Sequence, residues 1–133
     1  MALKVELKPG ERFILGESVI TNDDQRTRLY IEGSAPILRE KDIMRPEDAD
    51  TPCKKIYLVV QMMYLSGDPM AHHNSYFELV SQVQKAAPSL SPQISIINNE
   101  ILTGSFYKAL KATRLLIEAE SERFEYAKRG ASL

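Results

Sequence analysis

Short apolar runs, separated at close intervals by turn-forming residues, are the feature that most restricts how this chain can fold. They fill residues 10–36, GERFILGESVITNDDQRTRLYIEGSAP, where glycine, proline and an Asn-Asp-Asp cluster interrupt them. Within residues 26–32, Thr27, Leu29 and Ile31 alternate with arginines, a tyrosine and a glutamate. Alternation with a period of two is typical of a half-buried strand. The first third of the chain is therefore predicted to form short strands joined by tight turns.

The same interpretation extends to the flanking residues. Leu3, Val5 and Leu7 alternate with charged residues and precede Pro9-Gly10, a turn in which proline fixes φ and glycine accepts positive φ. Three further short apolar runs lie at residues 13–15, 19–21 and 37–39. Five short strands with turn residues between them predict a small antiparallel five-stranded sheet or barrel.

From Arg45 onward the pattern changes. The polar connector RPEDADTP contains two prolines and predicts a boundary between a β-module of residues 1–45 and a helical module of residues 46–133. Thr51-Pro52 predicts a helix start, because threonine caps helices and proline is tolerated at the first helical position. The apolar run that follows is predicted to end at Gly67.

Two more helices are predicted in the second module. One begins at Asp68-Pro69 and ends near Ala87-Pro88, and a long amphipathic helix runs from Ser105 to Arg129 and ends at Gly130. The apolar segment of residues 93–102 does not reveal its type. Because the strands come first and the helices after, the fold class is predicted to be α+β with segregated layers.

Charge and composition limit the functions that this chain can have. Its 17 Lys and Arg against 18 Asp and Glu give a net charge of −1, and neither module is basic. No global field attracts phosphate backbones, so nucleic-acid binding would need a local basic patch. No stretch approaches the length of a membrane span, and the N-terminus lacks the apolar core of a signal peptide. We expect a cytoplasmic protein.

No catalytic constellation is recognisable in the sequence. The single cysteine, Cys53, is expected to be an inert structural thiol, and the adjacent His72-His73 would point in different directions from a helix. The carboxylates near Glu120 alternate with basic residues, as solvating charges do. Nucleotide-binding and nucleophile motifs are absent from the sequence. We therefore expect a protein that is not an enzyme and needs no metal or cofactor.

Basic and aromatic side chains on the predicted strands are the candidates for binding. Cations that pair with phosphates, together with an aromatic ring for base stacking, are what single-stranded RNA requires. The alternative is an ordinary solvated face, because Glu6 and Glu32 share these faces. The candidate RNA-binding residues are Lys4, Lys8, Arg26, Arg28, Tyr30 and Arg39.

The first predicted helix carries apolar side chains almost all round its surface. Leu58, Met62 and Met63 are candidates for a protein interface, with filling of the core as the alternative. If the remaining helices cannot cover this excess, a second copy or another partner must do so. The sequence thus indicates a homo-oligomer, most simply a dimer.

The segments GERFILGESVI and RLYIEGSAPILREKDI resemble the early strand and the closing strand of the carbon storage regulator CsrA family. The resemblance covers about the first 43 residues. It implies a five-stranded, strand-exchanged dimer that binds messenger RNA leaders through its first and last strands. By position it assigns RNA contacts to Lys4, Leu7 and Lys8, and it leaves the last-strand contact to either Arg39 or Glu40.

The whole chain resembles the flagellar biosynthesis repressor family FlbT. The segments that carry this resemblance are LKVELKPGER, VITNDDQRTRLYIEGSAPILREKDI, DTPCKKIYLVVQMMYL and SFYKALKATRLLI. It implies post-transcriptional control of flagellin, through binding to the 5′ untranslated region of flagellin mRNA and promotion of its degradation. It also implies functional pairing with the regulator FlaF. Some members act positively, so the sign of regulation stays open, and an adaptor that holds flagellin or FlaF is the competing hypothesis.

Overall fold

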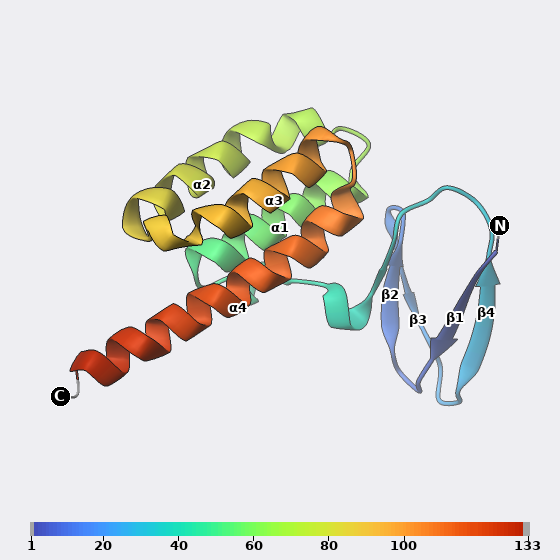
Figure 1. The fold of residues 1–133 in the computed structure, drawn as a ribbon. Coiled ribbons are helices and arrows are strands. Elements are labelled where there is room, and N and C mark those ends of the chain that lie inside the picture. The colour runs from blue at the N-terminus through green and yellow to red at the C-terminus, as the bar shows by residue number, and fades with distance from the viewer. Residues whose placement is uncertain (1, 132–133) are drawn as a thin grey trace. The chain divides into compact units, whose positions relative to one another are not determined.

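The structure, a computed structural model, describes residues 2–131 and the side chains as far as Tyr126. The chain divides into two compact units, Met1–Ile43 and Met44–Leu133 (Figure 1). The first unit contains the strands and the second contains the four α-helices. The polar connector predicts the boundary after Arg45, two residues later than the division in the structure.

Five short strands form in the N-terminal unit, where the alternation and the turn residues predict them. The Pro9-Gly10 turn also forms, and Gly10 adopts a φ of 72°, a conformation that glycine accepts without steric cost. A 3₁₀ turn, Glu40–Asp42, follows the last strand. The strands are β1 (Leu3–Leu7), β2 (Arg12–Leu15), β3 (Ser18–Thr21), β4 (Thr27–Ile31) and β5 (Ile37–Arg39).

The prediction of one five-stranded sheet or barrel is wrong. Strand β1 pairs with β4 in a two-stranded antiparallel sheet, and β2 lies between β3 and β5 in a separate three-stranded sheet. The physical reason lies in burial. A single layer of such short strands would leave its apolar face in water, whereas two layers cover each other's inner faces.

The core of this unit takes side chains from both sheets. Val5, Leu7 and Phe13 are buried, and Phe13 is completely inaccessible to solvent. Half-buried side chains from β2, β3, β4 and β5 pack against these three: Leu15, Ile20, Leu29, Ile31 and Ile37. In β1 and β4 the inward residues are those that the period-two pattern predicts, except Leu3, which is 50% exposed, and the charged residues between them face outward.

The helical unit contains α1 (Pro52–Leu65), α2 (His73–Ala86), α3 (Ser91–Leu102) and α4 (Phe106–Ala131). Short 3₁₀ turns, Pro46–Asp48, Pro69–His72 and Pro88–Leu90, precede α1, α2 and α3. The segment whose type the sequence does not reveal is thus a helix, and α4 runs through Gly130 to Ala131.

Helix α1 begins where the sequence predicts, because Thr51 caps it. The Thr51 hydroxyl accepts a hydrogen bond from the Lys54 N–H at 3.2 Å, which satisfies a backbone group that the first turn leaves unpaired. Near its other end, the buried Gln61 side chain accepts from the Met44 N–H at 2.7 Å and donates to the Met44 carbonyl at 3.0 Å. Two hydrogen bonds therefore fix the start of this unit's chain to α1.

The helices pack around a continuous apolar core. Helix α1 contacts α2 and α4, and α3 lies against α4. The C-terminal turns of α4 extend past the other three helices (Figure 1). Phe124, which the helical period places on the inward face, is 68% exposed and lines an open hollow with Val83 and Leu90. No helix among residues 2–131 is long and apolar enough to cross a membrane.

Candidate nucleic-acid interface

The outer face of the two-stranded sheet brings together most of the predicted RNA-binding residues. In the register of β1 and β4, Lys4 is opposite Tyr30 and Glu6 is opposite Arg28. All four side chains point away from the core, and Tyr30 is 64% exposed. A flat aromatic ring thus lies directly across the sheet from a lysine, which is the combination that stacks a base and pairs a phosphate.

Arg26 joins this face from the turn before β4. It lines a hollow of about 300 Å³ together with Glu6, Leu7, Thr27 and Arg28. That volume is at the lower end of the range for small-ligand pockets. Three cations and one aromatic ring therefore share one sheet surface, and we name this surface, Lys4, Arg26, Arg28 and Tyr30, the basic sheet face.

A carboxylate lies in the middle of the basic sheet face. One oxygen of Glu6 is 3.5 Å from the Lys4 ammonium and 3.3 Å from the Arg28 guanidinium. The hydrogen bond and the charge of Lys4, followed by the charge of Arg28, lower the pKa of Glu6 below its usual value. Glu6 therefore stays ionised and offsets part of the positive charge that a phosphate would meet.

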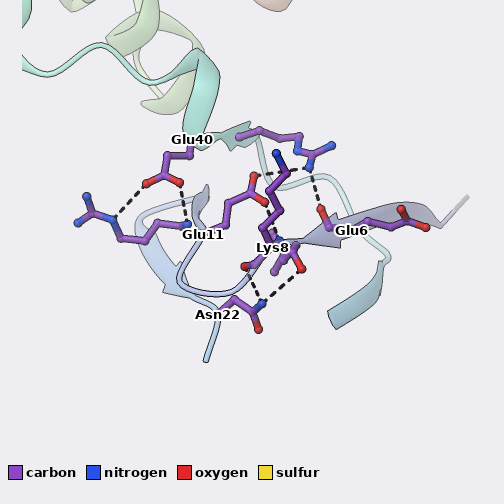
Figure 2. A network of polar contacts seen from close by, with 8 residues as sticks. Glu6, Lys8, Glu11, Asn22 and Glu40 are labelled. Carbon is purple, nitrogen blue, oxygen red and sulfur yellow. Dashed lines mark hydrogen bonds and ion pairs between the residues drawn. The ribbon is translucent and has the colours of Figure 1, made fainter. Parts of the chain in front are cut away.

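Lys8 lies in the turn after β1, in a network of backbone hydrogen bonds (Figure 2). Its N–H donates to the Glu11 carboxylate at 2.9 Å, and its carbonyl accepts from the Asn22 side chain at 2.8 Å. The hydrogen bond from Lys8 is the main cause that lowers the pKa of Glu11. The Asn22 side chain also donates to the Gln25 carbonyl at 2.8 Å. It therefore joins the β1–β2 turn to the connection between β3 and β4.

Arg39, on β5, belongs to the three-stranded sheet and not to the basic sheet face. Its guanidinium donates to the backbone carbonyl of Glu6 at 2.8 Å and lies 3.5 Å from the Glu11 carboxylate (Figure 2). This side chain therefore joins the last strand to the first. These contacts were not predictable, because nothing in the sequence around Arg39 distinguishes it from the solvated arginines.

The alternative last-strand residue, Glu40, also has internal partners. One of its carboxylate oxygens accepts from the Arg12 N–H at 3.4 Å, and the other is 3.7 Å from the Arg12 guanidinium (Figure 2). Neither Arg12 nor Asn22 was among the site residues predicted from the sequence. Asn22 could have been found from its place in the Asn-Asp-Asp turn, since asparagine side chains commonly bond to nearby backbone groups.

The three candidates for a protein interface on α1 lie in different environments. Met63 is only 1% exposed and packs in the core of the helical unit, whereas Met62 is exposed and Leu58 is half-buried. Only Leu58 and Met62 are thus placed to contact another chain.

The cysteine at the start of α1 is completely buried. The Glu120 carboxylate, on α4, accepts from the Cys53 N–H at 3.2 Å and from the Thr51 hydroxyl at 2.5 Å. Burial, reinforced by the charge of Glu120, raises the pKa of the Cys53 thiol to about 12. A thiol that stays protonated is a poor nucleophile. The described part of the chain holds no group of three or more His, Cys, Asp or Glu placed to bind a metal.

Comparison with known proteins identifies a family that this chain matches. Residues 3–124 match the family model described as "Flagellar protein FlbT". The chain is 58% identical to the "Probable flagellum biosynthesis repressor protein FlbT 1" of Bradyrhizobium diazoefficiens, over 92% of this chain and 84% of that protein. It is 52% identical to the "Probable flagellum biosynthesis repressor protein FlbT" of Rhodopseudomonas palustris, over 92% and 97%.

A more distant relative has a similar length. The "Flagellum biosynthesis repressor protein FlbT" of Caulobacter vibrioides is 37% identical to this chain, over 99% of this chain and 96% of that protein. No solved structure matches the chain significantly.

Proposed function

This chain belongs to the FlbT family of flagellar proteins, and from that premise we propose that it is a non-enzymatic, cytoplasmic post-transcriptional regulator of flagellum biogenesis. It binds the 5′ untranslated region of flagellin mRNA and promotes degradation of that transcript. The observation that carries the proposal is the basic sheet face, where Lys4, Arg26 and Arg28 surround an exposed Tyr30.

The chemistry of this face suits a single strand better than a duplex. A protein recognises duplex RNA by its shape and backbone, whereas the unstacked bases of a loop can lie against an aromatic ring while cations pair with the flanking phosphates. With a net charge of −1, the protein has little long-range attraction for RNA. Affinity must then come from contacts on this face, so it should depend on the loops of the leader.

The test is a titration of the flagellin leader at several salt concentrations. For single strands, log K falls with log salt by about 0.7 for each phosphate contact, so three cations predict a slope of about −2. The double variant with Lys4→Ala and Arg28→Ala loses two phosphate contacts, so its slope should be less negative by about 1.4. The matched control is Lys55→Ala with Lys85→Ala, two exposed lysines of the helical unit, which should leave affinity and slope unchanged.

A leader that stays unbound at low salt with saturating protein would reject direct RNA binding. The second candidate function, an adaptor for flagellin or FlaF, would then be favoured. The observation behind it is the half-buried Leu58 and exposed Met62 on α1. If the protein is an adaptor, the double variant with Leu58→Glu and Met62→Glu should no longer co-purify with flagellin or FlaF. The variant with Lys4→Ala and Arg28→Ala should still co-purify with them.

A further inference from the structure

The outer face of α4 carries charges that are segregated along the helix. Its side chains recur at intervals of three and four residues, so they lie along one stripe. The stripe begins with two lysines, has an apolar residue in the middle and continues with two glutamates, all of them exposed: Lys108, Lys111, Leu115, Glu118 and Glu122. We name these five residues the α4 stripe.

Leu115 is the centre of this arrangement. It is 58% exposed, although it lies on a helix whose opposite face forms much of the core. Lys108 precedes it by seven residues and Glu122 follows it by seven, while Lys111 precedes it by four and Glu118 follows it by three. The charge pattern is therefore antisymmetric about Leu115, positive on one side and negative on the other at nearly equal distances.

This antisymmetry identifies an occupant. We propose that the α4 stripe docks against the α4 stripe of a second copy of this chain, antiparallel, with the two Leu115 side chains on the two-fold axis. In that arrangement Lys108 of each copy lies opposite Glu122 of the other, and Lys111 lies near Glu118. A two-fold axis requires a surface to be complementary to itself, and this stripe meets that requirement. A parallel arrangement would place lysine against lysine.

The length of α4 supports the same arrangement. Its C-terminal turns extend past α1, α2 and α3 (Figure 1) and carry Tyr126, which is 80% exposed. Tyr126 follows Leu115 by eleven residues, about three helical turns, and so lies on the side of the stripe. In an antiparallel pair with Leu115 on the axis, Tyr126 of one copy lies opposite Gly104 of the other, in the turn that precedes α4. A dimer would also carry two basic sheet faces, which raises the affinity for a leader with two binding segments.

The decisive experiment uses sedimentation of the full chain over a range of concentrations. The wild type should form dimers, and the association should weaken as salt is added because it depends on ion pairs. Leu115→Glu should shift the dissociation constant at least about ten-fold upward, since it places two carboxylates on the axis. Phe77→Glu, which changes an equally exposed apolar side chain on α2 (54% exposed), is the matched control and should dimerise like the wild type.

Charge-reversal variants then test the antiparallel pairing itself. Lys108→Glu with Lys111→Glu makes the stripe entirely acidic, and Glu118→Lys with Glu122→Lys makes it entirely basic. Each variant alone should be monomeric, and an equimolar mixture of the two should form a heterodimer. All four positions are exposed, so circular dichroism should show both variants folded.

Two results would overturn the inference. One is a wild type that stays monomeric up to about 1 mM, which would show that the α4 stripe does not bind a second copy of this chain. The other is a dimer whose stability neither Leu115→Glu nor charge reversal changes, which would place the interface elsewhere. Neither result bears on RNA binding, so this proposal and the proposed function can fail separately.

Discussion

Replacement of Arg39 by alanine should destabilise the N-terminal unit, and this outcome distinguishes Arg39 from the cations of the basic sheet face. The arginine donates to the Glu6 carbonyl at 2.8 Å and lies 3.5 Å from the Glu11 carboxylate. Its Nε atom is buried and has no hydrogen-bond partner among the described residues. The guanidinium therefore joins β5 to β1, and without it the Glu6 carbonyl loses a charged donor.

The magnitude follows from the nature of these contacts. A hydrogen bond from a charged donor contributes about 1.5–3 kcal/mol, and the lower part of that range applies because the Arg39 side chain is 41% exposed. The ion pair with Glu11 adds less, as partly exposed pairs do. We expect Arg39→Ala to lower the free energy of unfolding of this unit by about 1.5 kcal/mol.

Hydrogen exchange measured by mass spectrometry locates the effect within the chain. In Arg39→Ala, peptides from β1 and β2 should exchange faster, whereas peptides from α1 should be unchanged. Arg28→Ala is the control, because Arg28 carries the same charge but its ion pair is with the exposed Glu6 carboxylate. If the β1 peptides exchange at the same rate in the two variants, the structural role of Arg39 is refuted. Arg39 would then again be a candidate RNA-binding residue.

Three further predictions follow from the same structure. Glu6→Gln should raise leader affinity about five-fold, in a filter-binding titration, because it removes a carboxylate that competes with phosphate for two cations; unchanged affinity would contradict that competition. Burial raises the pKa of Cys53 to about 12 and also raises the pKa of Tyr76. Because the unfolded state therefore loses these protons at a lower pH than the folded state, the free energy of unfolding should fall as pH rises above about 9. Urea denaturation at several pH values measures this fall. Cys53→Ala should flatten that dependence, and an identical slope would show that the thiol is not responsible. Phe13→Ala should cost the N-terminal unit about 3–5 kcal/mol by leaving a cavity, measured by thermal unfolding, whereas Val19→Ala at an exposed position should cost little.

The sequence predicts the elements well because each depends on nearby residues. Alternation in β1 and β4 identifies their inward sides, and Thr51-Pro52 marks the start of α1, since these patterns act within one strand or one helical turn. The division into two sheets was not predictable in the same way. Strand β1 pairs with β4 across the β2–β3 hairpin, and no local pattern specifies which distant strand becomes the neighbour.

The candidate site shows the same limit for individual side chains. Alternation correctly places Lys4 and Arg28 on outward faces, but only the register between two strands places Lys4 opposite Tyr30. Phe124 illustrates the converse, because the helical period predicts its direction while the ends of the neighbouring helices determine its burial. The period of a sequence pattern predicts the direction of a side chain, whereas the burial of that side chain depends on which elements pack against it.

The position of Glu6 bears on how a nearly neutral protein could select one transcript. Because its carboxylate pairs with Lys4 and Arg28, any RNA phosphate must displace it before it gains the full attraction of those cations. This competition weakens binding to every RNA alike, since all RNAs carry the same phosphates. Stacking on Tyr30 is not weakened, so loops that offer an unstacked base keep their advantage over RNAs that offer only a backbone. On the proposed function, Glu6 would therefore lower the affinity for RNA without changing selectivity, and Glu6→Gln should raise binding to unrelated RNA and to the flagellin leader by a similar factor.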